Sequence, residues 1–329
     1  MAVSTSSWKE LRSVLDSDKK LLKKPNLPLM ANQLNSLSLR MQDEELPRHA
    51  AVCHVEQAHL YQKMGNPNEE RKQYATAAGL LNSTIRSDMM NRSRVYSSSP
   101  SEMADAYSKS IKIAMDMKAF RIAGLTSLEA AKALVGCNHY DMAEEHAQRA
   151  VRLLEGEFYT YTRAVYLLAE IHFHLSEWEH LLADIDDLWM NVMKTRPKSV
   201  AGRRILKDLE VMTVLILQKS QVTPSGRHKL LKELYETRKT DEPQKKTTKP
   251  PVPDDSSLPI QEFIVFKKFL HLASTGNLRE ARGLMFEKGY MSTAATPVKT
   301  IRPKFSFLSP LGIQVLQRFL DENPDDYEY

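Results

Sequence analysis

Residues 130–154, AAKALVGCNHYDMAEEHAQRAVRLL, carry the pattern that decides the fold. Ala131 and Leu134 precede a break at Asn138. After the break, small residues return at three- and four-residue spacing, at Ala143, Ala147 and Ala150. Residues three and four apart share one face of an α-helix, so the stretch predicts two helices that cross closely around a short turn.

The same arrangement recurs along the chain. Ala58 and Ala77 flank Gly65 in 55–80, Ala169 and Trp178 flank Ser176 in 164–189, and Leu272 and Ala281 flank Gly276. Tetratricopeptide repeats are helix pairs of about 34 residues with small residues where the helices cross. The sequence therefore predicts an all-α, tetratricopeptide-like helical-repeat superhelix, an α-solenoid, with no β-sheet.

The chain divides by composition into three parts. Residues 1–240 are predicted to form the repeat array. Residues 241–259 contain five prolines and almost no apolar side chain, which predicts a disordered or extended linker. Residues 260–329 are predicted to add helices that complete the array, interrupted by a basic loop from about Gly289 to Pro310 and closed by an acidic tail.

Composition narrows the class of protein. The 329 residues are 42% hydrophobic and carry a net charge of +5, which is too mild to indicate nucleic-acid binding. We expect no membrane insertion and no secretion, because no apolar run approaches the roughly 20 residues of a bilayer span and the start is not that of a signal peptide. Cys53 and Cys137 are far apart, which favours two buried thiols in a reducing cytosol.

No sequence motif indicates catalysis. GxGxxG, GxSxG and P-loop patterns do not occur. His172 and His174 would diverge on a helix, so they are not expected to share a metal ion. The other potential metal ligands are expected to have no such role. Structural or surface roles are expected for His49, His54 and His59, and a solvated acidic face for Asp184, Asp186 and Asp187. We expect no catalytic residue, no cofactor and no metal.

Two segments are candidates for contact with a partner. Lys19, Lys20, Lys23 and Lys24 form a basic cluster beside Pro25, which could contact anionic lipid, an acidic partner or only water. In the second segment, basic and aromatic residues typical of interfaces lie together: Arg302, Lys304, Phe305 and Phe307. The two Phe side chains could instead pack onto the last repeat of the chain itself.

Several segments, in order, resemble the huntingtin-associated proteins of about forty kilodaltons, also called factor VIII intron proteins. They are KKLLKKPN (19–26), LPRHAAVCHVEQAHLYQ (46–62), KQYATAAGLL (72–81), LKDLEVMTVLILQKSQVTPSGRHKLLKELYE (206–236), EFIVFKKFLHLASTGNLREARGL (262–284) and LGIQVLQRFLDEN (311–323). Vertebrate members have a Gly- and Ala-rich start and a long Pro run that this chain lacks, so the resemblance is to an invertebrate member.

The resemblance implies a helical scaffold that binds and stabilises a huntingtin-like HEAT-repeat protein as a 1:1 heterodimer. It further implies a cytoplasmic protein associated with early endosomes, with an indirect link to a Rab-type GTPase, and with nuclear localisation as an additional expectation. Two other functions stay open on the residues alone. One is a vesicle-fusion adaptor similar to the soluble attachment proteins, and the other is a regulatory subunit of a cytosolic enzyme.

Overall fold

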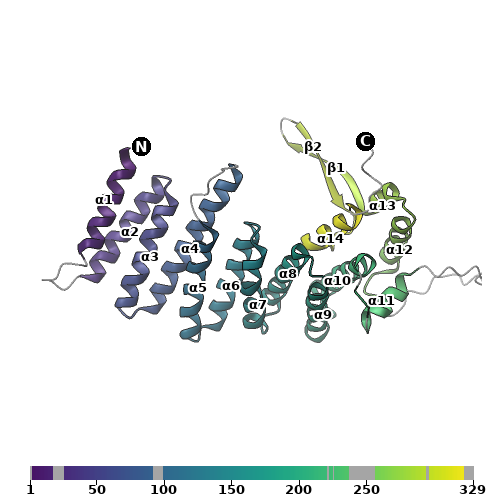
Figure 1. The fold of residues 1–329 in the computed structure, drawn as a ribbon. Helices are drawn as coiled ribbons and strands as arrows, with labels where there is room; N and C mark the ends of the chain where they lie inside the picture. Colours follow the sequence, from purple (N-terminus) through teal and green to yellow (C-terminus); the bar gives the residue numbers. More distant parts are fainter. Residues whose placement is uncertain are drawn as a thin grey trace, which may run out of the picture. The chain divides into compact units, whose positions relative to one another are not determined.

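The computed structural model describes residues 2–17, 26–91, 99–220, 222–224, 226–236, 256–293 and 296–321. Over these residues the chain is built from fourteen helices and one strand pair (Figure 1). Each helix from α2 to α7 packs against the next in the chain, which is the arrangement of an α-solenoid. The predicted fold class, an all-α helical-repeat protein, is confirmed.

The chain separates into two compact units, Met1–Ile171 and His172–Tyr329, referred to below as the first and second units. The first unit contains α1 (Ala2–Ser17), α2 (Leu27–Asp43), α3 (Pro47–Lys63), α4 (Pro67–Met90), α5 (Pro100–Asp116), α6 (Phe120–Val135), α7 (Tyr140–Leu154) and most of α8 (Phe158–Leu175). The second contains the end of α8, α9 (Trp178–Thr195), α10 (Val200–Lys219), α11 (Arg227–Tyr235), α12 (Ile260–Ser274), α13 (Leu278–Met285), β1 (Phe286–Thr293), β2 (Thr296–Pro303) and α14 (Pro310–Asp321). The boundary thus differs from the predicted one at 240, because α14 packs on α10 and joins the late helices to α9–α11.

Six of the described helices, α2, α3, α5, α6, α8 and α12, end in the same type of turn. Its central residue has a positive φ of 58° to 80° at Glu45, Gly65, Lys118, Asn138, Ser176 and Gly276. The next residue then donates its backbone N–H to a carbonyl five residues back, as from Asn66 to Tyr61 at 2.9 Å and from His139 to Leu134 at 3.0 Å. This geometry satisfies carbonyls that the helix end leaves unpaired and reverses the chain.

Several helices begin at a polar residue whose side chain caps the first turn, at Asn26, Asn66, Ser99, Ser199 and Asn277. A polar cap followed by proline opens α4 and α5, where Asn66 precedes Pro67 and Ser99 precedes Pro100. The Asn66 side chain accepts a bond from a backbone N–H of the first turn. Proline costs nothing at this position because the first N–H groups of a helix have no intrahelical partner.

Small residues bring the helices of the first unit together, as predicted. The alanines of the repeat pattern are fully buried at 0% exposure: Ala58, Ala77, Ala131, Ala143, Ala147 and Ala150. Contact between α6 and α7 is so close that a methyl group at Gly124 would lie 2.9 Å from the Leu154 side chain. The crossing therefore has no space for a larger side chain.

Two buried carboxylates on α10 hold the later segments of the second unit. Asp208 is 1% exposed and accepts a hydrogen bond at 2.9 Å from the backbone of Ser309, the residue before α14. A methyl group at Gly312 would collide with the same carboxylate. The start of α14 is therefore fixed against α10 by an anion near its N-terminus, where the helix dipole favours negative charge.

Glu210, on another face of α10, is 0% exposed. It accepts three hydrogen bonds of 2.6 Å, from the hydroxyls of Tyr235 and Ser256 and from the backbone N–H of Ser257. Leu258 follows and is 2% exposed. At the C-terminal end of the predicted linker 241–259, residues 256–258 are thus anchored to the core. Residues 241–255 lie outside the described ones, so the linker stays a prediction there.

A two-stranded antiparallel hairpin corrects the prediction that the chain has no β-sheet. Strands β1 and β2 pair from Phe286 with Pro303 to Thr293 with Thr296. The predicted loop from about Gly289 to Pro310 contains much of this hairpin. In β2 the apolar residues Val298 and Ile301 are three apart, so the strand lacks the period-2 alternation that would have predicted it from the sequence.

The prediction of two buried thiols is confirmed. Cys53 and Cys137 are both free and buried. Burial raises the pKa of Cys53 to about 12, and the Cys53 thiol contacts the sulfur of Met41 at 3.6 Å. Among the described residues, no helix is both long and apolar enough to cross a membrane.

We predict that Ala147→Leu destabilises the first unit by about 1–3 kcal/mol, because the added side chain has no space in the α6–α7 contact. Chemical denaturation measures the change. Ala183→Leu, at an exposed position of α9, is the matched control and should leave the midpoint within error. An unchanged midpoint in the Ala147 variant would show that α6 and α7 are not closely packed.

We predict that His146 makes the stability of the first unit depend on pH. The side chain is 5% exposed, and burial, with a contribution from Arg149, lowers its pKa. Below the ordinary pKa of about 6.5 the unfolded chain binds a proton that the folded chain resists, so stability should fall from pH 7 to pH 5. His146→Leu should reduce this slope and exposed His139→Asn should not; equal slopes in all three proteins would contradict the prediction.

We predict that Glu210→Gln destabilises the second unit by about 1–3 kcal/mol, because an amide cannot accept all three hydrogen bonds and turns a donor toward other donors. Urea unfolding followed by Tyr and Trp fluorescence measures the effect. Glu233→Gln, on exposed α11 surface, is the matched control. If both variants unfold like the wild type, the carboxylate does not anchor residues 256–258.

Candidate partner-binding surfaces

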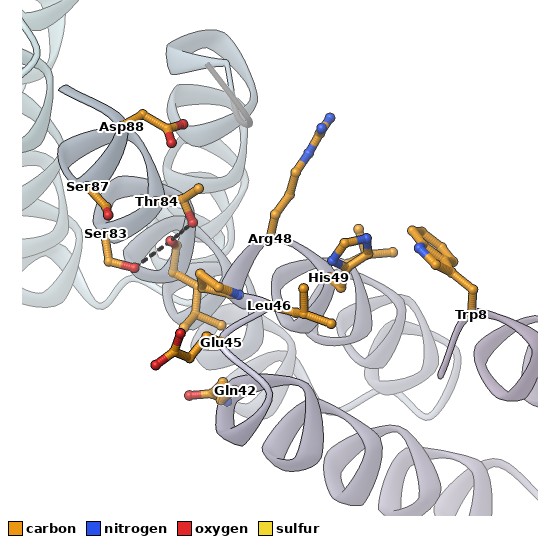
Figure 2. A pocket seen from close by; sticks show the side chains of 13 residues that line it. Trp8, Gln42, Glu45, Leu46, Arg48, His49, Ser83, Thr84, Ser87 and Asp88 are labelled. Carbon is orange, nitrogen blue, oxygen red and sulfur yellow. Dashed lines mark hydrogen bonds between the residues drawn. The ribbon is translucent and has the colours of Figure 1, made fainter. Parts of the chain in front are cut away.

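A hollow of about 990 Å³ lies at the N-terminal end of the first unit. Helices α1, α2, α3 and α4 and the turn at Glu45 contribute to it (Figure 2). Its walls are formed by Trp8, Gln42, Glu45, Leu46, Pro47, Arg48, His49, Val52, Leu80, Ser83, Thr84, Ser87 and Asp88. The repeated turn between α2 and α3 is therefore part of the surface that the hollow presents.

One wall of this hollow is aromatic and basic. The rings of Trp8 and His49 meet edge to face with centroids 4.9 Å apart, and Trp8 remains 44% exposed. Burial, together with the charge of Arg48, lowers the pKa of His49, which favours the neutral ring beside Trp8. Exposed Trp and Arg are the residue types that contribute most to binding at protein interfaces.

The hydroxyl groups on the opposite wall are hydrogen-bonded to the backbone of their own helix, α4. Ser83 and Thr84 both donate to the backbone carbonyl of Leu80, at 2.7 and 2.9 Å (Figure 2). Neither proton is held by a general base, which a nucleophilic hydroxyl would need. Their arrangement suits a binding wall better than a reactive site.

The first unit also contains a buried Ser–His pair. The Ser38 hydroxyl lies 2.8 Å from Nε2 of His54, whose Nδ1 lies 2.7 Å from the Gln73 amide oxygen. Ser38 is 0% exposed and His54 is 7% exposed. A substrate has no access to this hydroxyl, so the pair joins α2, α3 and α4 as a structural network, in agreement with the predicted role of His54.

In the second unit, α9, α11 and residues 256–257 line a hollow of about 550 Å³. Met193 and Leu230 border it and are 47% and 59% exposed. Arg227 stacks over the ring of Trp189, with its guanidinium carbon 3.4 Å from the ring centroid. Exposed apolar side chains beside a fixed Trp–Arg pair form a second candidate contact surface.

The residues predicted to contact a partner have different surroundings. Lys19, Lys20, Lys23 and Lys24 lie outside the described residues. Arg302 lies on β2 in register with Glu287, and Lys304 is exposed and donates to the carbonyl of Gly283 at 2.8 Å. Their role in partner binding stays a prediction.

Phe305 and Phe307 are largely withdrawn from solvent. Each is 7% exposed, and their rings stack with centroids 5.1 Å apart. The ammonium group of Lys207 on α10 lies 5.3 Å from the centre of the Phe307 ring, and Arg204 donates to the carbonyl of Ser306. The structure thus shows the alternative raised from the sequence, in which the Phe pair packs onto the chain's own helices.

The solvated acidic face predicted for α9 is wrong at Asp184. Asp184 has a side chain only 13% exposed and lies 2.6 Å from His172. The side chain of Asp186 is 39% exposed. One of its oxygens forms an ion pair with Arg227 at 2.8 Å, and the other lies 2.8 Å from Nε2 of His228. Asp187 is exposed as predicted. Each carboxylate that faces another helix finds a basic partner there, which a reading of one helix alone does not reveal.

Sequence reasoning missed the apolar surface of α9. Met190 and Met193 are 68% and 47% exposed. They lie off the buried stripe formed by Leu181, Ile185, Leu188 and Val192. Two apolar residues outside the stripe of an otherwise amphipathic helix were the signal that could have identified this surface.

Comparisons with known proteins show no family for this chain. No family's sequence model matches it, and no curated protein matches it. Among solved structures, the crystal structure of BtubC (BKLC) from P. vanneervenii is similar over 77% of this chain and 99% of that chain, with 13% sequence identity and a TM-score of 0.37. Likeness at that level carries no inference about function.

Proposed function

We propose that this chain is a non-catalytic scaffold subunit that binds and stabilises a huntingtin-like HEAT-repeat protein. The observation that carries the binding role is the pair of hollows in which exposed apolar or aromatic residues lie beside arginine, at Trp8 with Arg48 and at Met193 and Leu230 with Arg227. Helical repeats favour this role because each helix buries its apolar face against its neighbours and leaves the outer surface for a partner.

The identity of the partner rests on the sequence resemblance described above. It points to a 1:1 heterodimer in the cytoplasm, recruitment to early endosomes with an indirect Rab-type GTPase link, and a nuclear fraction. The two alternative functions predict different partners. A vesicle-fusion adaptor would bind SNARE components, and a regulatory subunit would bind an enzyme complex.

We expect affinity purification of the tagged chain from cells of its own species, followed by mass spectrometry, to recover a single large HEAT-repeat protein in about equal molar amount. The double variant Met193→Glu, Leu230→Glu should reduce this recovery at least about tenfold, because charges replace apolar residues at a candidate interface. Both positions are exposed, so the variant should fold normally.

Val200→Glu is the matched control, since Val200 is 79% exposed in the same unit and does not line the hollow. Its recovery of the partner should equal that of the wild type. Stoichiometric recovery of SNARE components or of an enzyme complex would replace the proposal with the corresponding alternative. Recovery of the HEAT-repeat protein by the double variant at the wild-type level would exclude this hollow as the contact surface.

A further inference from the structure

Three potential metal ligands gather where α8 turns into α9. They are His172 near the end of α8, Glu177 in the turn, and His180 in the first turn of α9. One nitrogen or oxygen atom from each lies within 4.8 Å of the other two. From the sequence, His172 was not expected to share a metal ion with His174 on the same helix; the turn instead brings Glu177 and His180 back toward it.

His172 has the surroundings of a preoriented ligand. Its side chain is 5% exposed, and its Nδ1 lies 2.6 Å from Oδ2 of Asp184. A carboxylate only accepts hydrogen bonds, so Nδ1 carries the proton and Nε2 has the lone pair that binds metal. Nε2 is the nitrogen nearer Glu177, at 3.9 Å from Oε2. Metal-binding histidines commonly donate their second ring N–H to a carboxylate in this way.

The other two ligands are able to adjust. Nδ1 of His180 lies 3.0 Å from Oε2 of Glu177, and the centres of the two histidine rings are 5.3 Å apart. The side chains of His180 and Glu177 are 69% and 40% exposed, so small rotations can bring both onto an ion held by His172. The ion would replace the present contact between His180 and Glu177.

Arg318 of α14 also fixes the turn between α8 and α9. Arg318 of α14 donates to the carbonyl of Phe173 and to the hydroxyl of Ser176, both at 3.1 Å. Its guanidinium also lies over the rings of Phe173 and Trp178, at 5.1 and 4.9 Å from their centroids. A backbone fixed at the turn lowers the entropy that a metal ion must overcome to order its ligands.

We propose that His172, Glu177 and His180 form a zinc site. Asp184 orients His172 by accepting the hydrogen bond of its Nδ1, on the side of the ring away from the ion. Two imidazole nitrogens and one carboxylate oxygen suit Zn²⁺, whereas Mg²⁺ and Ca²⁺ prefer oxygen ligands alone. A hollow of about 460 Å³ beside Glu177 and His180 leaves space for water at the fourth position. The ion joins the end of α8 to the start of α9 within the second unit.

The test uses the full untagged chain, stripped with a chelator and titrated with Zn²⁺ against a chromogenic chelator. We expect one ion bound per chain with a micromolar or lower Kd. Exposed His180→Gln should weaken binding at least tenfold without affecting folding, and Asp184→Asn should weaken it about 10- to 100-fold. His174→Gln, at an exposed position of α8 two residues from His172, is the matched control and should bind Zn²⁺ as the wild type does.

Co²⁺ provides a second readout. Visible d–d absorption of four-coordinate Co²⁺ should appear in the wild type and in the His174 variant and be absent in His180→Gln. Thiolate-to-cobalt charge transfer is not expected, because Cys53 and Cys137 are buried. Equal Zn²⁺ affinity in the wild type and His180→Gln, or thiolate ligation of Co²⁺, would overturn the proposal.

Discussion

The repeated turn with one residue in the left-handed region is the constraint on which the rest of the structure depends. At Gly65, Asn138 and Ser176 it ends one helix, satisfies its last carbonyls and reverses the chain within a few residues. Because the turn is short, neighbouring helices pack closely, and at the α6–α7 contact no side chain larger than that of glycine fits at Gly124. The same turn brings residues of two helices to one end, where the hollow beside Glu45 and the cluster beside Ser176 lie.

Much of this architecture could be predicted from sequence, because turn residues and small residues are local signals. The breaks at Gly65, Asn138 and Ser176 and the buried alanines needed only the spacing of residues within one helix pair. Contacts between distant segments gave no such signal. Glu210 lies within the apolar run LEVMTVLIL and Asp208 directly before it, and their partners Tyr235, Ser256, Ser257 and Ser309 lie 25 to 101 residues away.

The candidate sites, too, were predictable where they depend on local sequence and not where they depend on contacts between segments. Phe305 and Phe307 were identified as a notable pair, but whether they face a partner or α10 depends on tertiary packing, which no periodicity encodes. His172 was correctly separated from His174 on the helix. Its proximity to Glu177 and His180 depends on the reversal of the chain at Ser176. The break at Ser176 is visible in the sequence, but the side chains that it brings together are not.

Burial of the two cysteines has a consequence for how the protein responds to its chemical surroundings. A thiol reacts with oxidants and electrophiles as its thiolate, and burial raises the pKa of Cys53 and of Cys137, so both remain protonated at neutral pH. The folded chain is thereby insensitive at these positions to the redox poise of its compartment. Because both sulfurs are buried, we expect them to be modified mainly when the first unit opens. The rate of thiol modification would then report local or global unfolding of this unit.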